Sequence, residues 1–363
     1  MAGRRWPGTD SSMQELEMRH LESPKVGWDY KRATAKASAL LRRGAFFSNR
    51  LIAFAIILTL NFVLPRMMPG DPFQAIYGEE ALLAMTPQLK AELVERFALD
   101  QSMGQQFVAY ILALAGGDLG HSYYYNQEVL AVILDFLPWT LLLTGMALVI
   151  STLAGMILGI ESGYRRGRQL DRTLLAGLMF LNGFPDFFMG IVLLLVFGVV
   201  FGIVPLSGAL TPYSGLEGLP LALDILHHLL APLTALVLVR VTSAYLLTRN
   251  TMITTLKENF ILTARAKGCS EGQIKYRHAG RNSLLPVVTA TGLMIPHVIT
   301  GALFVEIVFS YPGVGWLLYN ALLTRDYPLI QGILLMVTVA VLLANLLVDL
   351  LYFKLDPRVS HAR

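Results

Sequence analysis

Six long apolar stretches dominate the sequence and limit the folds that are open to it. Each has about the twenty mostly hydrophobic residues that a helix needs to cross the hydrocarbon core of a bilayer. They cover residues 46–65, 137–160, 173–201, 229–247, 284–309 and 329–353. The chain is 55% hydrophobic and 15% charged, against roughly 25% charged residues in a soluble domain. We therefore expect an all-α polytopic membrane protein with six transmembrane helices.

The lysines and arginines are distributed very unevenly between these stretches. Ten lie in residues 1–50, four in 161–172, seven in 249–281 and three after the last stretch. The alternate segments hold four, and one further residue, Arg240, lies inside a stretch. Because cytoplasmic loops carry the excess of basic residues, we expect both termini and the 249–283 loop to be cytoplasmic.

Outside the spans we expect three further segments. Residues 1–45 lack the continuous apolar run of a cleavable leader, and are interpreted as a cytoplasmic extension, either solvated or lying along the membrane as an amphipathic helix. Residues 46–355 form the permease domain, within which residues 68–132 lie outside as a small helical insertion. Thr86 and Pro87 predict the start of one helix there, and a second is expected from Gly104 to Ala115. Residues 356–363 form a cytoplasmic tail.

The loop between the fourth and fifth stretches has the strongest local signals. Residues 256–267 favour helix, and Gly268 is expected to end it. Ser270 followed by Gln273 has the form of a capping box, which predicts a second helix running toward Pro286. The loop contains no nucleophile paired with a base and no set of metal ligands, and the single Cys269 excludes an intramolecular disulfide. We therefore expect no catalytic residue, no metal site and no cofactor. By itself, a basic loop of this kind indicates only that the loop is on the cytoplasmic side of the membrane.

The segment "TARAKGCSEGQIKYRHAGRNSLLPVVT" resembles the cytoplasmic coupling motif of ATP-binding-cassette importer permeases of the dipeptide, oligopeptide and nickel branch. Further matches occur in the family's order: "PGDP" at 69–72, "GDLGHS" at 117–122, "EIVFSYPGVG" at 306–315, "RDYPLIQG" at 325–332 and "LDPRV" at 355–359. The likeness covers residues 45–360 and is greatest to the first-permease type, which has a long loop after its first span. The chain departs from the broader importer motif, which has Glu-Ala-Ala where this sequence has Thr263-Ala264-Arg265, a form common in this branch. The amino-terminal extension is longer than is usual in the family.

The resemblance implies a type I importer permease fold in the inner membrane of a prokaryote. It also implies that the helix near Gly268 docks into a cytoplasmic ATPase, and the small Ala264 and Ala266 leave room for a close approach. The implied coupling residues are Glu258, Thr263, Ala264, Arg265, Ala266, Lys267, Gly268 and Ser270. The implied partners are a second homologous permease, two ATPase subunits, an extracytoplasmic substrate-binding protein and membrane lipid, but no nucleic acid. The chain has no G-x-x-x-x-G-K-[ST] loop to cradle phosphates, so the ATPase activity is assigned to partner chains.

Two other classes of protein are alternatives to a permease. An intramembrane enzyme would need a catalytic constellation, and neither Ser207-Gly208 nor His227-His228 has the companions that such a site requires. A self-contained channel would show no ATPase activity with co-purified partners. For a permease, dipeptides or oligopeptides are the favoured cargo, with nickel, a metal chelate, a sugar or another small solute as alternatives.

Charged side chains within a span cost roughly 2.5–3.5 kcal/mol near its centre and mark functional positions. Glu306 and Asp349 lie near span ends and are interpreted as structural or as snorkelling toward the membrane surface. Asp186, Arg240 and His297 lie near the middle of their own spans and are the candidate translocation-path residues. Three interpretations stay open: an Asp186–Arg240 ion pair that fixes helix packing, a path in which Arg240 faces peptide groups, and a metal path using Asp186 and His297.

Overall fold

The computed structural model of the chain describes residues 52–68, 75–76, 78, 85–86, 88, 101–294, 298 and 302–355, with side chains described up to residue 346. The chain divides into two compact units, Met1–Leu60 and Asn61–Arg363. In the first unit the described residues are helical and begin the helix Ile52–Arg66. The predicted extension 1–45, most of the predicted helix after Thr86, and the tail 356–363 lie outside the described residues.

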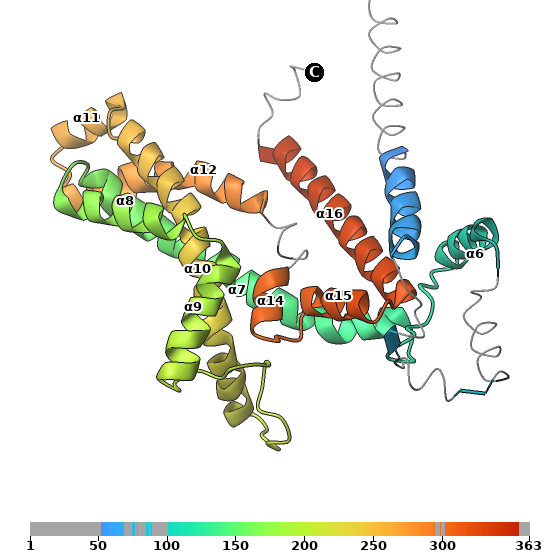
Figure 1. Cartoon of the computed structure of the whole chain (residues 1–363). Coiled ribbons are helices and arrows are strands. Elements are labelled where there is room, and N and C mark those ends of the chain that lie inside the picture. The colour runs from blue at the N-terminus through green and yellow to red at the C-terminus, as the bar shows by residue number, and fades with distance from the viewer. Residues whose placement is uncertain are drawn as a thin grey trace, which may run out of the picture. The chain divides into compact units, whose positions relative to one another are not determined.

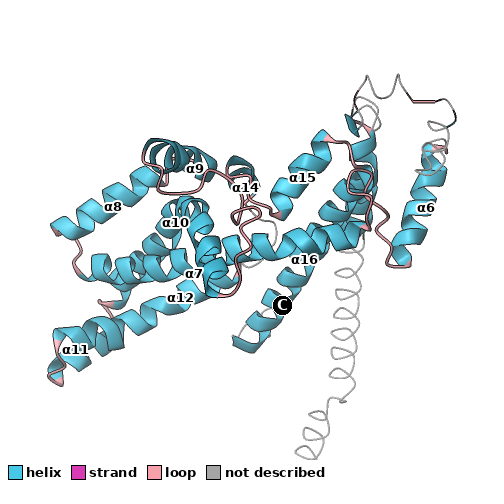
Figure 2. Cartoon of the chain, turned by 90° about the horizontal axis from the view of Figure 1, so that it is seen from below, coloured by secondary structure: helices cyan, strands magenta, loops and turns pink. Residues whose placement is uncertain are grey.

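The second unit is helical wherever its elements are described (Figure 1). Apart from an isolated bridge between His121 and Glu128, the residues that the structure describes form no strand (Figure 2). The elements with described bounds are α6 (Met103–Ala115), α7 (Val129–Tyr164), α8 (Gln169–Leu181), α9 (Asp186–Leu193), the π-helix η1 (Leu194–Val200), α10 (Leu219–Thr255), α11 (Asn259–Ala266), the π-helix η2 (Gln273–Gly280), α12 (Arg281–Gly292), α14 (Leu303–Val308), α15 (Val314–Leu323) and α16 (Tyr327–Leu355).

Helix α7 is the central element of this unit, and three apolar clusters along it attach the other helices. Its first turns pack against α15 and α16, its middle against α10 and α14, and its last turns against α10, α11 and η2. A helix that is apolar around its whole circumference can be covered by protein on one side and by lipid on the other. The long α7 therefore positions the 249–283 loop at one end and the α15–α16 pair at the other.

Three glycines bring α7 and α10 into backbone contact. Gly155, Gly159 and Gly163 recur every four residues on one face of α7, as in the close-packed small-xxx-small interfaces of membrane helices. A Cβ atom at Gly155 would lie 2.6 Å from the Cβ of Ala244, and one at Gly159 would lie 2.5 Å from the Cβ of Thr248. Neither position has room for a side chain unless the helices move apart.

Three helices among the described residues are long and apolar enough to cross a membrane: Val129–Tyr164, Leu219–Thr255 and Tyr327–Leu346. A fourth span is counted if α8 and the segment Asp186–Val200 form one span, although they are bent by 94°. The described part of the first predicted span is the shorter helix Ile52–Arg66. The described residues thus establish a multi-helix membrane protein, and the total of six spans stays a prediction.

The third predicted span, 173–201, is not one continuous helix. Helix α8 ends at Leu181, and α9 begins at Asp186 after a turn. Pro185 has no N–H group to continue a helix and takes an extended backbone with φ −60° and ψ 149°. The apolar run 173–201 predicts one continuous span, but the break places Asp186 in the first turn of a new helix.

Helix α6 confirms the second helix predicted in the 68–132 segment. Ser102 caps it by accepting a hydrogen bond from the N–H of Gln105, whose side chain reaches back to Ser102. Gly116 ends it, and Gly117 follows with φ +80°. The location of this segment on the outer side of the membrane stays a prediction.

Candidate coupling segment and intramembrane site

The candidate coupling segment contains a short helix that packs against the ends of α7 and α10. Helix α11 begins at Asn259, three residues later than predicted, because Glu258 is extended and Leu256 lies in the turn that ends α10. Ile261 and Ala264 are buried on its inner face. Ile261 packs with Ile160 of α7, Met252 of α10 and two residues of η2. The inner face of α11 is therefore in direct contact with both long helices.

Gly268 ends α11 as the sequence predicts. Its φ of +75° is a conformation that residues with a side chain rarely adopt. Its N–H donates to the carbonyl of Arg265 at 2.9 Å, and the N–H of Cys269 donates to that of Ala264 at 3.2 Å, which together form a Schellman motif. A Cβ atom at Gly268 would meet no atom within 4 Å, so backbone strain rather than crowding requires glycine here.

The predicted capping box at Ser270 is confirmed. The N–H of Ser270 donates to the side-chain oxygen of Gln273 at 3.0 Å, and the N–H of Gln273 donates to the Ser270 hydroxyl at 3.4 Å. The helical segment that follows continues through η2 and α12 to Gly292, so it runs past Pro286 instead of ending there.

The outer face of α11 combines basic and large apolar side chains. Thr263, Arg265, Ala266, Lys267, Gly268, Glu258 and Ser270 are exposed, whereas Ala264 is buried and serves the packing of α11 within the chain. Phe260 and Leu262, which no sequence signal singled out, have side chains that are 40% and 61% exposed. Exposed large apolar groups beside a polar rim are typical of protein–protein contact surfaces.

A second set of contacts ties η2 to α7. Lys275 is buried and forms an ion pair with Glu161, and the Tyr276 hydroxyl donates a hydrogen bond to the same carboxylate. Arg165 lies 3.6 Å from the other oxygen of Glu161. The Lys275 ammonium also lies 4.7 Å from the centre of the Tyr276 ring. These contacts brace the segment that follows α11 against the end of the central helix.

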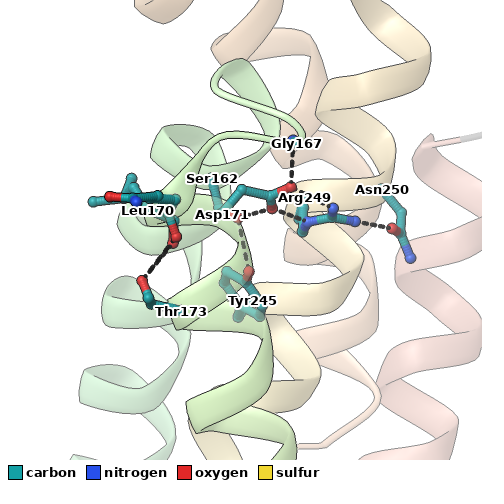
Figure 3. A network of polar contacts seen from close by, with 9 residues as sticks. Ser162, Gly167, Leu170, Asp171, Thr173, Tyr245, Arg249 and Asn250 are labelled. Atoms are coloured by element: carbon teal, nitrogen blue, oxygen red, sulfur yellow. Dashed lines mark hydrogen bonds and ion pairs between the residues drawn. The ribbon is translucent and has the colours of Figure 1, made fainter.

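A buried network joins α7, α8 and α10 near the same end (Figure 3). Arg249 donates two hydrogen bonds to the Asp171 carboxylate, from Nε at 2.6 Å and from Nη2 at 2.8 Å. The Ser162 hydroxyl donates to Asp171 at 2.6 Å and lies 2.7 Å from the Tyr245 hydroxyl, and the N–H of Gly167 donates at 2.8 Å. Such a two-pronged guanidinium–carboxylate pair is geometrically specific, so the network holds the 165–168 turn in place.

Glu306, interpreted above as structural, stabilises the start of α15. Its fully buried carboxylate accepts hydrogen bonds from the N–H groups of Gly315 at 2.7 Å and Trp316 at 3.2 Å, and from the Thr140 hydroxyl at 3.0 Å. A carboxylate is favourable at a helix N-terminus, where backbone N–H groups lack partners. A Cβ atom at Gly313 would overlap this carboxylate. The residues of the "EIVFSYPGVG" stretch thus form one local structure.

Two other stretches that carry the resemblance lie in contact. Asp326 of "RDYPLIQG" is fully buried and accepts hydrogen bonds from the hydroxyl of Ser122, in "GDLGHS", and from the N–H of Tyr124 at 3.0 Å. Its other oxygen accepts from the N–H of Leu329 at 3.2 Å and caps α16. The "GDLGHS" loop is therefore anchored to the start of α16.

The three candidate path residues are only partly located. Asp186 opens α9, and its carboxylate accepts a hydrogen bond from the N–H of Phe187 at 2.9 Å. Arg240 lies partly buried in α10, within electrostatic range of Asp186, but no ion pair within 4.0 Å joins the two in the described structure. His297 lies outside the described residues. The common depth of all three therefore stays a prediction.

Arg240 lines a cavity of about 430 Å³ between α7, α10 and α12. The other polar groups of its lining are the hydroxyls of Ser151, Thr152, Ser243 and Thr291. Most of the remaining lining is aliphatic. The cavity can therefore hold a small solute that has both a charged end and an apolar body.

These features define a class of protein: a polytopic membrane protein whose long helices carry a rigidly attached, exposed basic helix at one end. The family model of the "binding-protein-dependent transport system inner membrane component" matches residues 151–361, more than half of the chain. The chain belongs to this family of inner-membrane transport permease components.

Several curated relatives are similar over nearly their whole length. The di/tripeptide transport system permease protein DppB of Pseudomonas aeruginosa is 34% identical over 321 residues, covering 85% of this chain and 95% of the relative. The dipeptide transport system permease protein DppB of Escherichia coli is 33% identical over 330 residues, covering 85% and 96%. A putative peptide permease protein of Brucella suis is 36% identical over 314 residues, covering 85% and 97%.

Proposed function

We propose that this chain is one of two permease subunits of an ATP-driven, binding-protein-dependent importer of dipeptides or oligopeptides. The family assignment supports the permease role, and the names of the relatives favour peptides over nickel or a metal chelate as cargo. The other subunits would be a second homologous permease, two ATPases that hydrolyse the nucleotide, and an extracytoplasmic substrate-binding protein. Both termini would be cytoplasmic, with six spans between residues 46 and 355.

The observation that carries the coupling role is the geometry of α11. On its inner face, Ile261 packs against α7 and α10. Its outer face exposes Leu262 together with Arg265 and Lys267. A helix that is rigid on one side and unpartnered on the other suits the transmission of force from a second protein. The 249–283 loop would therefore be displaced when the ATPases close, and this displacement would move the long helices.

The test is to place a carboxylate on the outer face of α11. Leu262→Asp and Ala266→Asp leave the inner contacts intact, but each brings an unpaired charge into the proposed interface. Burying a charge without a partner costs about 3–5 kcal/mol, which weakens association more than about 100-fold. We expect normal membrane insertion, loss of ATPase subunits on co-purification and loss of peptide uptake.

A matched control adds the same carboxylate elsewhere on the predicted cytoplasmic side. Gln169 is exposed in the first turn of α8, where a carboxylate suits the helix N-terminus. Gln169→Asp is expected to retain ATPase binding and uptake. Normal uptake by both α11 variants would show that this helix is not the docking element.

A further inference from the structure

The partly buried position of Arg240 inside a predicted span is unusual for a charged residue. It lies in α10 within the predicted span 229–247, where a charged side chain costs roughly 2.5–3.5 kcal/mol on the insertion scale. Such residues normally pair with another charge or with backbone carbonyl groups. We therefore expect the guanidinium of Arg240 to have an anionic or carbonyl partner.

The described residues do not supply that partner. The guanidinium has no hydrogen bond to any of them, and its only electrostatic neighbour among them is Asp186. Asp186 is beyond ion-pair distance, and its carboxylate is bonded to the N–H of Phe187. The contrast with Arg249 of the same helix is clear, because that guanidinium makes two short hydrogen bonds to one carboxylate.

The cavity beside Arg240 has the chemistry of a small-ligand site. Its volume of about 430 Å³ lies within the roughly 300–1,000 Å³ typical of small-molecule sites. Aliphatic side chains such as Leu148, Leu247 and Val287 form most of its wall. Ser243 adds a hydroxyl that can both donate and accept hydrogen bonds, whereas the hydroxyls of Ser151 and Thr291 donate to carbonyl groups of their own helices and can still accept. The cavity is therefore lined by one cation, several hydroxyl groups and an apolar surface.

We propose that this cavity is a binding station for the transported peptide and that Arg240 binds the terminal carboxylate of that peptide. A guanidinium matches a carboxylate with two parallel hydrogen bonds. The hydroxyls would bond to the amide of the peptide, and the aliphatic wall would accept side chains of varied shape. The proposal rests on the peptide-importer function above, and it adds a group within the membrane that requires a free carboxyl end.

The first experiment uses the assembled wild-type complex of both permeases and the ATPases in nanodiscs, without the binding protein. Equilibrium binding is measured for radiolabelled dialanine and for dialanine C-terminal amide, which lacks the carboxylate. A hydrogen-bonded charge pair contributes about 1.5–3 kcal/mol, so the free acid is expected to bind roughly 10-fold to 100-fold more tightly. Equal affinity for the two peptides overturns the proposal, and this comparison needs no variant to fold.

The second experiment assigns the preference to Arg240. Arg240→Gln is expected to remove the discrimination between acid and amide, and Arg240→Lys is expected to retain part of it. Ser243→Ala should weaken binding of both peptides alike. Thr234→Ala is the matched control, because Thr234 is exposed on the same helix and lies outside the cavity lining. An assembled Arg240→Gln complex with the wild-type preference also overturns the proposal.

Uptake measurements separate this inference from the proposed function. With the binding protein and ATP, the wild-type complex in proteoliposomes is expected to accumulate dialanine. A wild-type complex that accumulates no peptide contradicts the importer function itself. A complex that accumulates dialanine but binds acid and amide equally refutes only the role of Arg240.

Discussion

Replacing Asp171 tests whether the buried network of Figure 3 stabilises the predicted cytoplasmic end of the helix bundle. Asp171→Ala removes a carboxylate that accepts hydrogen bonds from Ser162, Gly167 and twice from Arg249. The guanidinium of Arg249 then loses its partner in a place where its side chain is only 14% exposed. The perturbation therefore creates a lone charge as well as a small cavity.

The magnitude follows from the geometry of the pair. Removing one partner of a buried ion pair costs about 3–5 kcal/mol, and the partial exposure of Arg249 favours the lower end, about 3 kcal/mol. The double variant Asp171→Ala/Arg249→Met has no lone charge, so it is expected to recover part of this loss. The resulting interaction energy should be about 1.5–3 kcal/mol.

The assay is reversible unfolding of the purified permease by titration with a denaturing detergent, followed by tryptophan fluorescence. Arg165→Met is the matched control, because Arg165 is 47% exposed and lies 3.6 Å from Glu161. Exposed pairs of this kind contribute about 0–1 kcal/mol. If Asp171→Ala changes the unfolding free energy no more than Arg165→Met does, the network has no stabilising role and the reasoning fails.

Three further predictions concern packing, capping and topology. Gly159→Ala is expected to destabilise the permease by about 1–3 kcal/mol through overpacking against α10. Gly177→Ala should be tolerated, because a Cβ atom there meets no atom within 4 Å. Similar unfolding curves for the two variants would contradict the backbone contact. Glu306→Ala leaves buried N–H groups of α15 without an acceptor, at about 1–3 kcal/mol, and an unchanged unfolding midpoint would exclude the capping role. In a Cys269→Ala background, a cysteine at Lys90 should react only with reagent added outside the cell, and labelling from the cytoplasm alone would reverse the topology.

The sequence predicted helix ends and caps correctly where a few adjacent residues decide them. The end of α11 at Gly268 depends on one backbone angle, and the capping box depends on Ser270 and Gln273 alone. The spacing of Gly155, Gly159 and Gly163 could also have revealed the α7–α10 contact, since small residues four apart mark close-packed membrane helices. The sequence analysis did not use that signal.

The third predicted span shows where apolar composition was misleading. Hydropathy alone reads residues 173–201 as one segment, but the helix breaks after Leu181 and resumes at Asp186 with a bend of 94°. The size of the bend depends on how each half packs against α10 and the residues around it. A window average contains no information on packing.

The sequence by itself determined that this is a helical membrane protein, that α11 ends at Gly268, and which family the chain belongs to. Those features depend on composition, on periodicity and on neighbouring residues. The tertiary structure alone decided which polar groups meet: Asp171 with Arg249, 78 positions away, and Ser122 with Asp326, 204 positions away. A buried polar group needs a hydrogen-bond partner because its desolvation is costly. The sequence contains many residues that could be that partner. Only the packing of the helices decides which of them lies within hydrogen-bond distance.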